Sequence, residues 1–257
     1  IAGLVKGASK GEGLGNKFLS HIREVDAIIH MIRCFDSNDI QNVNSDVDPI
    51  RDLEIIETEM MLADLESIQK RLEKNNKKNI DEKQTTILEI ALDCIDNQKD
   101  ISVLKNQFNK KELNQSGLLS VKPKIFVCNV DERSVQKGNE YTKNFINKYG
   151  NENTLIVSAD IENQINELDE KERKNYMEMI GLNETGLDML IQKGYKILQL
   201  DTFFTSGPEE TRAWTIQKNC TAPRAAGEIH SDFEKGFIRA ETISYDDFVA
   251  NDGWVNS

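Results

Sequence analysis

An apolar run that ends in an asparagine, KIFVCN, occupies residues 124–129. Its residues are apolar at consecutive positions rather than at alternate ones, which is typical of a strand buried on both faces of a parallel sheet. Similar runs stand at 27–32 (AIIHMI) and 154–157 (TLIV), and the spacing at 139–149 predicts a helix. Because strand, helix and strand recur, the sequence predicts an α/β domain with a doubly wound parallel sheet.

Three loops could reach the carboxyl ends of these strands, where doubly wound sheets bind their ligands. Residues 129–132 follow the central run, and residues 158–159 follow the last one. Residues 3–15 hold five glycines, too many for a regular helix or strand. We therefore expect a flexible loop there, and a candidate binding site where the three segments meet.

Residues 49–119 interrupt the α/β pattern. Apolar residues recur at helical spacing before and after a charged, Asn-rich stretch, which predicts an antiparallel helical hairpin. A packing appendage is the simpler interpretation, and a lever or nucleic-acid-binding arm is the alternative. From residue 195 onward, short alternating segments separated by turns predict a small α+β domain. The predicted domains are 1–48 together with 120–194, then 49–119, then 195–257.

The composition excludes several classes of protein. Lys and Arg number 32 against 44 Asp and Glu, a net charge of −12 that disfavours a general polyanion binder. No stretch approaches the ~18 apolar residues of a membrane span, and no secretory signal is visible, so we expect a cytoplasmic protein. The four cysteines form no C-x-x-C pair and the three histidines share no ligand spacing. This pattern predicts reduced thiols and no structural metal.

Long motifs at both ends of the chain resemble one protein family. Residues 1–16 read IAGLVKGASKGEGLGN, residues 203–208 and 212–216 read FFTSGP and RAWTI, and residues 225–238 read AAGEIHSDFEKGFI. Together they resemble the YchF family, the Obg-like ATPases of the translation-factor class of P-loop GTPases, over essentially the whole chain. The resemblance implies a P-loop NTPase-like parallel sheet with an inserted helical hairpin, followed by a ubiquitin-like α+β module, the TGS domain.

The same resemblance implies that this sequence is part of a longer protein. In the family an Asp before Ile1 completes the D-x-x-G motif, the P-loop lies earlier still, and a final TGS strand follows Ser257. We therefore expect the magnesium ligands to lie outside these residues, and we expect no hydrolysis by this segment alone. The full-length protein is expected to bind Mg²⁺ with ATP, or with GTP, and to hydrolyse the nucleotide.

The resemblance assigns nucleotide contacts to the three loops. The residues concerned are Gly3, Asn129, Val130, Glu132, Ser158 and Ala159. Gly3 matches the glycine of D-x-x-G, whose N–H would meet the γ-phosphate. Glu132 stands where the GTPase motif N-K-x-D has the Asp that pairs with guanine, and its side chain is one methylene longer. Since adenine lacks the N2 donor of guanine, a displaced carboxylate loses less with ATP than with GTP. Taken alone, residues 129–132 are more simply interpreted as an Asx-capped turn.

Two further positions bear on catalysis. Leu4 stands where many GTPases have the Gln that orients the attacking water, and leucine cannot orient water. Asn42 stands where family members often have a His that is implicated in hydrolysis, and asparagine cannot accept a proton near neutral pH. The sequence therefore leaves the catalytic residues unassigned.

We interpret the chain as part of a nucleotide-dependent switch that acts as a monomer and associates with the ribosome or its RNA, and not with membranes. The alternative is a nucleotide-gated ribosome- or RNA-binding module with little hydrolytic activity. A third interpretation, a free-standing RNA-binding fragment, requires a basic face that joins the two ends of the chain.

Overall fold

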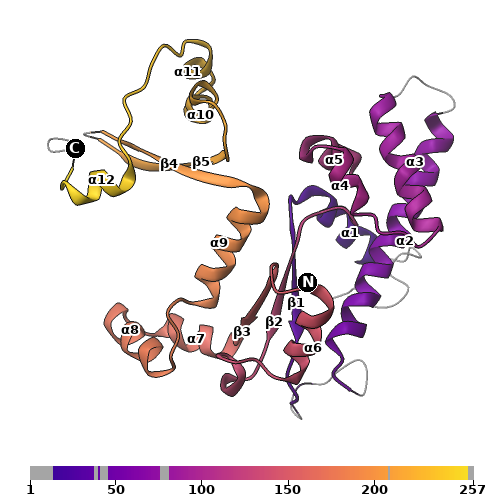
Figure 1. Ribbon diagram of the computed structural model, residues 1–257, viewed down its shortest axis with the longest axis horizontal. Coiled ribbons are helices and arrows are strands. Elements are labelled where there is room, and N and C mark those ends of the chain that lie inside the picture. Colours follow the sequence, from indigo (N-terminus) through magenta and orange to yellow (C-terminus); the bar gives the residue numbers. More distant parts are fainter. Residues whose placement is uncertain (1–13, 38–39, 41–45, 76–80, 208, 254–257) are drawn as a thin grey trace. The chain divides into compact units, whose positions relative to one another are not determined.

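The structure is a computed structural model in which the chain divides into two compact units between Leu198 and Gln199. It describes residues 14–37, 40, 46–75, 81–207 and 209–253. The first unit holds a small sheet with helices around it (Figure 1). Its elements are α1 Leu14–Glu24, β1 Ile28–Arg33, α2 Pro49–Asn75, α3 Glu82–Asp96, α4 Val103–Gln107, α5 Lys110–Ser116, β2 Lys124–Asn129, η2 Glu132–Ser134, α6 Glu140–Tyr149, β3 Thr154–Val157, α7 Ala159–Glu167, α8 Glu170–Met179 and α9 Gly186–Leu198.

The predicted strands form one parallel sheet in the order β1-β2-β3. Ile28 pairs with Lys124 across β1 and β2, and Phe126 pairs with Thr154 across β2 and β3. The α/β class and the parallel sheet predicted from the sequence are confirmed. Because all the strands run in one direction, their carboxyl ends meet at one edge, where the predicted loops begin.

Helices cover both faces of the sheet. On one face, Leu53 of α2 and Phe145 of α6 pack with Ile32 and Cys128 of the strands. On the other face, side chains from α9 pack against buried residues of β2 and β3. The buried strand residues of that face are Ile125, Val127, Leu155 and Val157, and the α9 residues are Met189, Leu190 and Ile197. This burial on both faces explains why β2 and β3 read as continuous apolar runs. In β1 the side chains of Ile29 and Met31 are exposed, so the prediction that this strand is buried on both faces is wrong.

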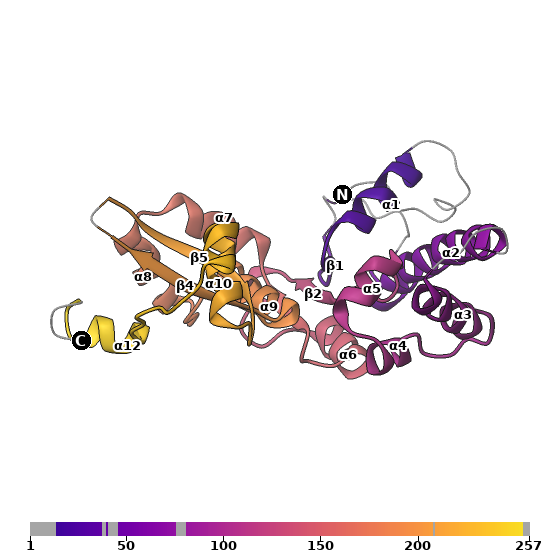
Figure 2. The same ribbon diagram turned by 90° about the horizontal axis from the view of Figure 1, so that it is seen from above.

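The insertion between β1 and β2 is the expected helical hairpin. α2 and α3 lie side by side in both views (Figures 1 and 2), with Ile68 of α2 and Leu88 of α3 buried between them. Two short helices, α4 and α5, follow and pack on α3. α5 ends at Gly117, whose φ of 67° is the left-handed conformation that favours glycine at a helix end.

A buried carboxylate joins the hairpin to the start of β2. Asp64 of α2 has a fully buried side chain and accepts from the Leu119 N–H at 2.9 Å. It also accepts from the N–H of Ser120 at 2.8 Å and from its hydroxyl at 2.6 Å. Burial raises the pKa of Asp64, while these hydrogen bonds act to lower it. The carboxylate therefore fixes the turn from which β2 departs.

The same region holds the carboxyl end of α1. Arg23 donates to the Gly117 carbonyl at 2.7 Å and lies 3.8 Å from Asp64 Oδ1. The Lys122 ammonium donates to the carbonyls of Arg23 and Val25, which a helix end leaves without partners. Burial lowers the pKa of Lys122. α1, the hairpin and β2 are thus tied together by polar contacts as well as by packing.

His30 of β1 is a buried histidine whose ring stacks on Phe126. Its Nε2 lies 3.9 Å from Glu57 Oε1 and has no hydrogen-bond partner among the described residues. Burial lowers the pKa of His30 to about 4, with the nearby Glu57 acting to raise it and Lys124 to lower it. Glu57 is itself paired with Lys124 at 2.7 Å. The imidazole is therefore neutral in the folded protein at neutral pH.

We expect His30 to make folding stability fall in mild acid. Between pH 6.5 and 4 the imidazole of His30 is protonated in the unfolded chain and neutral in the folded chain. The contribution of His30 to the free energy of unfolding is therefore complete above pH 6.5 and is lost as the pH falls. The loss should reach about 3 kcal/mol. Urea unfolding across this range checks it: His30→Gln should flatten the slope of stability against pH. Substitution of the exposed His21 to Gln is the control, and an equal slope in both variants would contradict the assignment.

The second unit is small and begins slightly beyond the predicted boundary at residue 195, because α9 continues to Leu198. Its elements are β4 Leu200–Ser206, β5 Thr211–Gln217, α10 Ala222–Ile229, α11 Ser231–Lys235 and α12 Tyr245–Ala250. β4 and β5 form an antiparallel hairpin in which the Trp214 indole N–H donates to Thr205. The alternation at 237–243 predicts another strand, yet these residues form neither strand nor helix. No helix in the described part of the chain has the length and apolar character of a membrane span.

Candidate functional site

The carboxyl ends of β2 and β3 bring two of the predicted loops together. Asn129 ends β2, and Ser158 follows β3. The Ala159 N–H donates to Asn129 Oδ1 at 3.0 Å, and the Val130 N–H donates to the Val157 carbonyl at 2.9 Å. Only the amide oxygen of Asn129 can accept from Ala159. This contact fixes which end of the amide carries the oxygen, and so the direction in which Nδ2 can donate. None of the described residues accepts a hydrogen bond from it.

Ser158 has a buried hydroxyl that makes no hydrogen bond to the described residues. The residue is 1% exposed. It precedes α7 in the N-cap position but makes no side-chain cap. An unpaired buried hydroxyl costs about 1–3 kcal/mol, so a partner from a ligand or from another segment would be favourable.

Val130 lies differently from its neighbours. The residue is 2% exposed and packs in the core cluster that holds Ile32 and Phe145. Its side chain contributes to packing below the loop. The side chain of Val130 is therefore not available to a ligand. The predicted contact between Val130 and the base rests on the position of this residue in the loop.

Glu132 is held by two side chains that sequence reasoning did not single out. The Gln164 amide of α7 donates to Glu132 Oε1 at 2.6 Å. The Tyr176 hydroxyl of α8 in turn donates to Gln164 Oε1. Neither residue belongs to a recognisable motif, and they stand 32 and 12 positions from their partners. No signal in the sequence could have joined them to residues 129–132.

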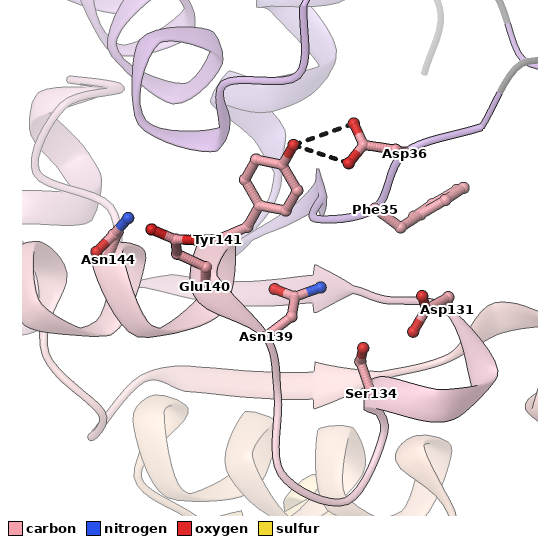
Figure 3. A pocket seen from close by; sticks show the side chains of 8 residues that line it. All are labelled: Phe35, Asp36, Asp131, Ser134, Asn139, Glu140, Tyr141 and Asn144. Carbon is pink, nitrogen blue, oxygen red and sulfur yellow. Dashed lines mark hydrogen bonds between the residues drawn. The ribbon is translucent and has the colours of Figure 1, made fainter.

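A cavity of about 480 Å³ opens beside this loop, on the side of β1 and α6 (Figure 3). Figure 3 shows the Tyr141 hydroxyl directed at Asp36, where it donates to both carboxylate oxygens at 3.0 Å. This bond raises the pKa of Tyr141. The carboxylates of Asp36, Asp131 and Glu140 among the lining residues make the cavity unsuited to a phosphate. The lining residues are Phe35, Asp36, Asp131, Ser134, Asn139, Glu140, Tyr141 and Asn144.

Several predicted positions lie outside the described residues. Gly3, Leu4 and Asn42 are among them, so the structure places only the loops after β2 and β3. Within the described ranges, no group of His, Cys, Asp and Glu side chains could hold a metal ion. All four cysteines are free thiols. The structure therefore describes the two loops after β2 and β3, and the nucleotide contacts predicted for them stay a prediction.

Comparison with known proteins gives consistent results over the whole chain. The family model for the C-terminal region of YchF GTPases, described as a protein of unknown function, matches residues 200–256. The ribosome-binding ATPase YchF of Bacillus subtilis is 44% identical over 100% of this chain and 73% of its own length. Obg-like ATPase 1 of Pongo abelii is 41% identical over 96% of this chain and 66% of its own length.

A solved structure agrees with these relatives. The structure of the Schizosaccharomyces pombe YchF GTPase superposes with a TM-score of 0.80 at 34% identity, covering 99% of this chain and 72% of that one. The identity with the curated relatives extends through the sheet, the hairpin and the second unit. The chain therefore belongs to the YchF family of Obg-like ATPases.

Proposed function

We propose that the full-length protein is a switch that binds ATP, or alternatively GTP, with Mg²⁺, hydrolyses it to the diphosphate and associates with the ribosome. Family membership supports this proposal, since the curated relatives are named ribosome-binding ATPases and Obg-like ATPase. Direct RNA contact, a monomeric state and a cytoplasmic location are parts of the same proposal. In this scheme residues 1–48 and 120–194 belong to the nucleotide-binding domain, 49–119 form the hairpin insertion, and 195–257 form the TGS domain.

One observation carries the nucleotide proposal, namely the contact between the loops after β2 and β3. Ala159 fixes the Asn129 amide so that its Nδ2 group can donate to a ligand. Purine N7 is an acceptor in both adenine and guanine, so this donor suits either base. The unpaired hydroxyl of Ser158 supplies a second polar group at the same edge. Such an edge is where doubly wound sheets bind ligands.

The phosphate end of the nucleotide belongs to residues outside the described ranges. Gly3 is proposed to meet the γ-phosphate with its N–H, together with the segments that hold Mg²⁺. The bound ion would neutralise negative charge on the phosphates. The described residues contribute the base side: Asn129 and Ser158 donate, Ala159 orients, and Glu132 offers a carboxylate.

We expect Asn129→Ala to weaken ATP and GTP binding by the full-length protein alike, by about tenfold. The physical reason is that the substitution removes a donor to a base atom that both nucleotides share. Equilibrium titration with the non-hydrolysable analogues of ATP and GTP measures the effect. Asn106→Ala, which removes an exposed amide of α4, is the control and should change neither affinity. Unchanged binding by Asn129→Ala would place the base elsewhere.

The alternative function is a nucleotide-gated ribosome- or RNA-binding module with little hydrolysis. Single-turnover hydrolysis by the full-length protein, with and without ribosomes and with EDTA as the metal-free control, separates the two. Release of phosphate that requires Mg²⁺ supports the switch. Nucleotide-dependent ribosome binding without phosphate release supports the module.

A further inference from the structure

Glu132 is the end of a chain of side-chain hydrogen bonds that crosses three elements. Its Oε1 accepts from Gln164 Nε2 at 2.6 Å, and Gln164 Oε1 accepts from the Tyr176 hydroxyl. Gln164 and Tyr176 are partly buried, whereas Glu132 is exposed at the loop after β2. Because Tyr176 occupies the amide oxygen of Gln164, the amide nitrogen is the atom that faces the carboxylate.

The helices that supply this chain are themselves fixed in place. Ile161 and Ile165 anchor α7 in the core, and the Arg173 side chain of α8 donates to the Ile165 carbonyl at 3.3 Å. The loop after β2 is also tied to the end of α8, since Gln136 donates to the Ile180 carbonyl. α7 and α8 therefore form a rigid brace behind the loop that carries Glu132.

The brace changes what Glu132 can offer to a base. A two-pronged contact with guanine needs both carboxylate oxygens, one for N1–H and one for the N2 amino group. Gln164 takes one of the two lone-pair positions of Oε1 and fixes the carboxylate, so that Oε2 is the oxygen with both positions open. Adenine presents a single amino donor on its pairing edge, and one open oxygen satisfies it. Guanine presents two donors, and one of them is left without a carboxylate oxygen.

We propose that Gln164, oriented by Tyr176, is a positioning residue that sets base preference by holding Glu132 as a single acceptor. This inference rests on the proposed nucleotide function. The brace favours the binding of ATP over GTP because Gln164 holds the carboxylate oxygen that the second guanine donor would need. Gln164 touches neither substrate nor metal in this arrangement, and acts through Glu132.

The test is the ratio of the dissociation constants for non-hydrolysable GTP and ATP analogues, measured by calorimetry on the full-length protein. Gln164→Ala should lower the GTP-to-ATP ratio about fivefold by freeing Oε1. Tyr176→Phe removes only a hydroxyl and should lower the ratio less, in the same direction, because the amide is then free to turn. Asn163→Ala is the control, since it removes the neighbouring exposed amide of α7, which pairs with Glu167.

The outcomes separate this inference from the function on which it rests. A shifted ratio in Gln164→Ala and Tyr176→Phe, with none in Asn163→Ala, supports the brace. An equal loss of affinity for both nucleotides, or an unchanged ratio, overturns it and leaves the nucleotide function standing. If the wild-type protein binds neither nucleotide, the proposed function itself is overturned. Far-ultraviolet circular dichroism of each variant confirms that the fold is retained before the ratios are compared.

Discussion

Asp64→Ala is expected to lower the free energy of unfolding by about 3–5 kcal/mol. The substitution removes the acceptor for two buried backbone N–H groups, those of Leu119 and Ser120, and for the Ser120 hydroxyl. It also leaves Arg23 without the carboxylate that lies 3.8 Å from it. Water cannot easily replace these contacts, because the side chain is fully buried. Urea unfolding followed by circular dichroism measures the loss.

A second substitution on the same helix provides the control. Glu66 of α2 pairs with Lys70 one turn away, and both side chains are more than half exposed. Exposed pairs of this kind contribute little to stability, so Glu66→Ala should leave unfolding nearly unchanged. If the two alanine variants unfold at the same urea concentration, Asp64 does not fix the turn before β2.

Glu132→Asp is expected to raise GTP affinity relative to ATP by about tenfold, or ~1.4 kcal/mol, in the full-length protein. The shorter side chain restores the length with which GTPases read guanine, and it withdraws the carboxylate from Gln164. Both oxygens then become available to N1–H and N2–H of the base. Titration of both nucleotide analogues against wild type and variant measures the shift.

Glu132→Asp is tested alone, without a second substitution of Val130 to lysine, because Val130 is buried. A lysine there would complete the GTPase motif, but the residue is 2% exposed and a buried ammonium would destabilise the fold. Glu132→Gln is the matched control: it keeps the length, removes the charge and should bring no gain for GTP. Strong GTP selectivity in the wild-type protein, or no shift in Glu132→Asp, would show that another group reads the base.

The sheet and the hairpin were predictable because their signals are local. Residues 124–129 and 154–157 are apolar runs, and burial on both faces of a sheet allows such runs to continue without alternation. The hairpin is predicted by apolar residues at helical spacing, as in α3, where Ile87, Leu88 and Ala91 are buried. In both cases the residues that decide the element lie within it.

The contacts that organise the site were not predictable, because they join residues far apart in the chain. Asp64 meets Leu119 across 55 positions, and Glu132 meets Gln164 across 32. The strand expected at 237–243 failed for a related reason. Alternation describes a strand that has a partner, and none of the described strands pairs with these residues. The sequence pattern records neighbours in the chain, whereas these features depend on neighbours in space.

The distribution of the cysteines has a practical consequence. Cys34, Cys94 and Cys128 are buried in the first unit, while Cys220 of the second unit is partly accessible. A thiol reacts only when reagent reaches it, so the buried sulfurs are shielded until their surroundings open. The native chain therefore carries its own chemical probes. Modification of Cys220 reports on the accessibility of the end of the hairpin β4–β5. Modification of the buried thiols reports on local opening of the sheet and of α3. No additional cysteine has to be introduced for either measurement.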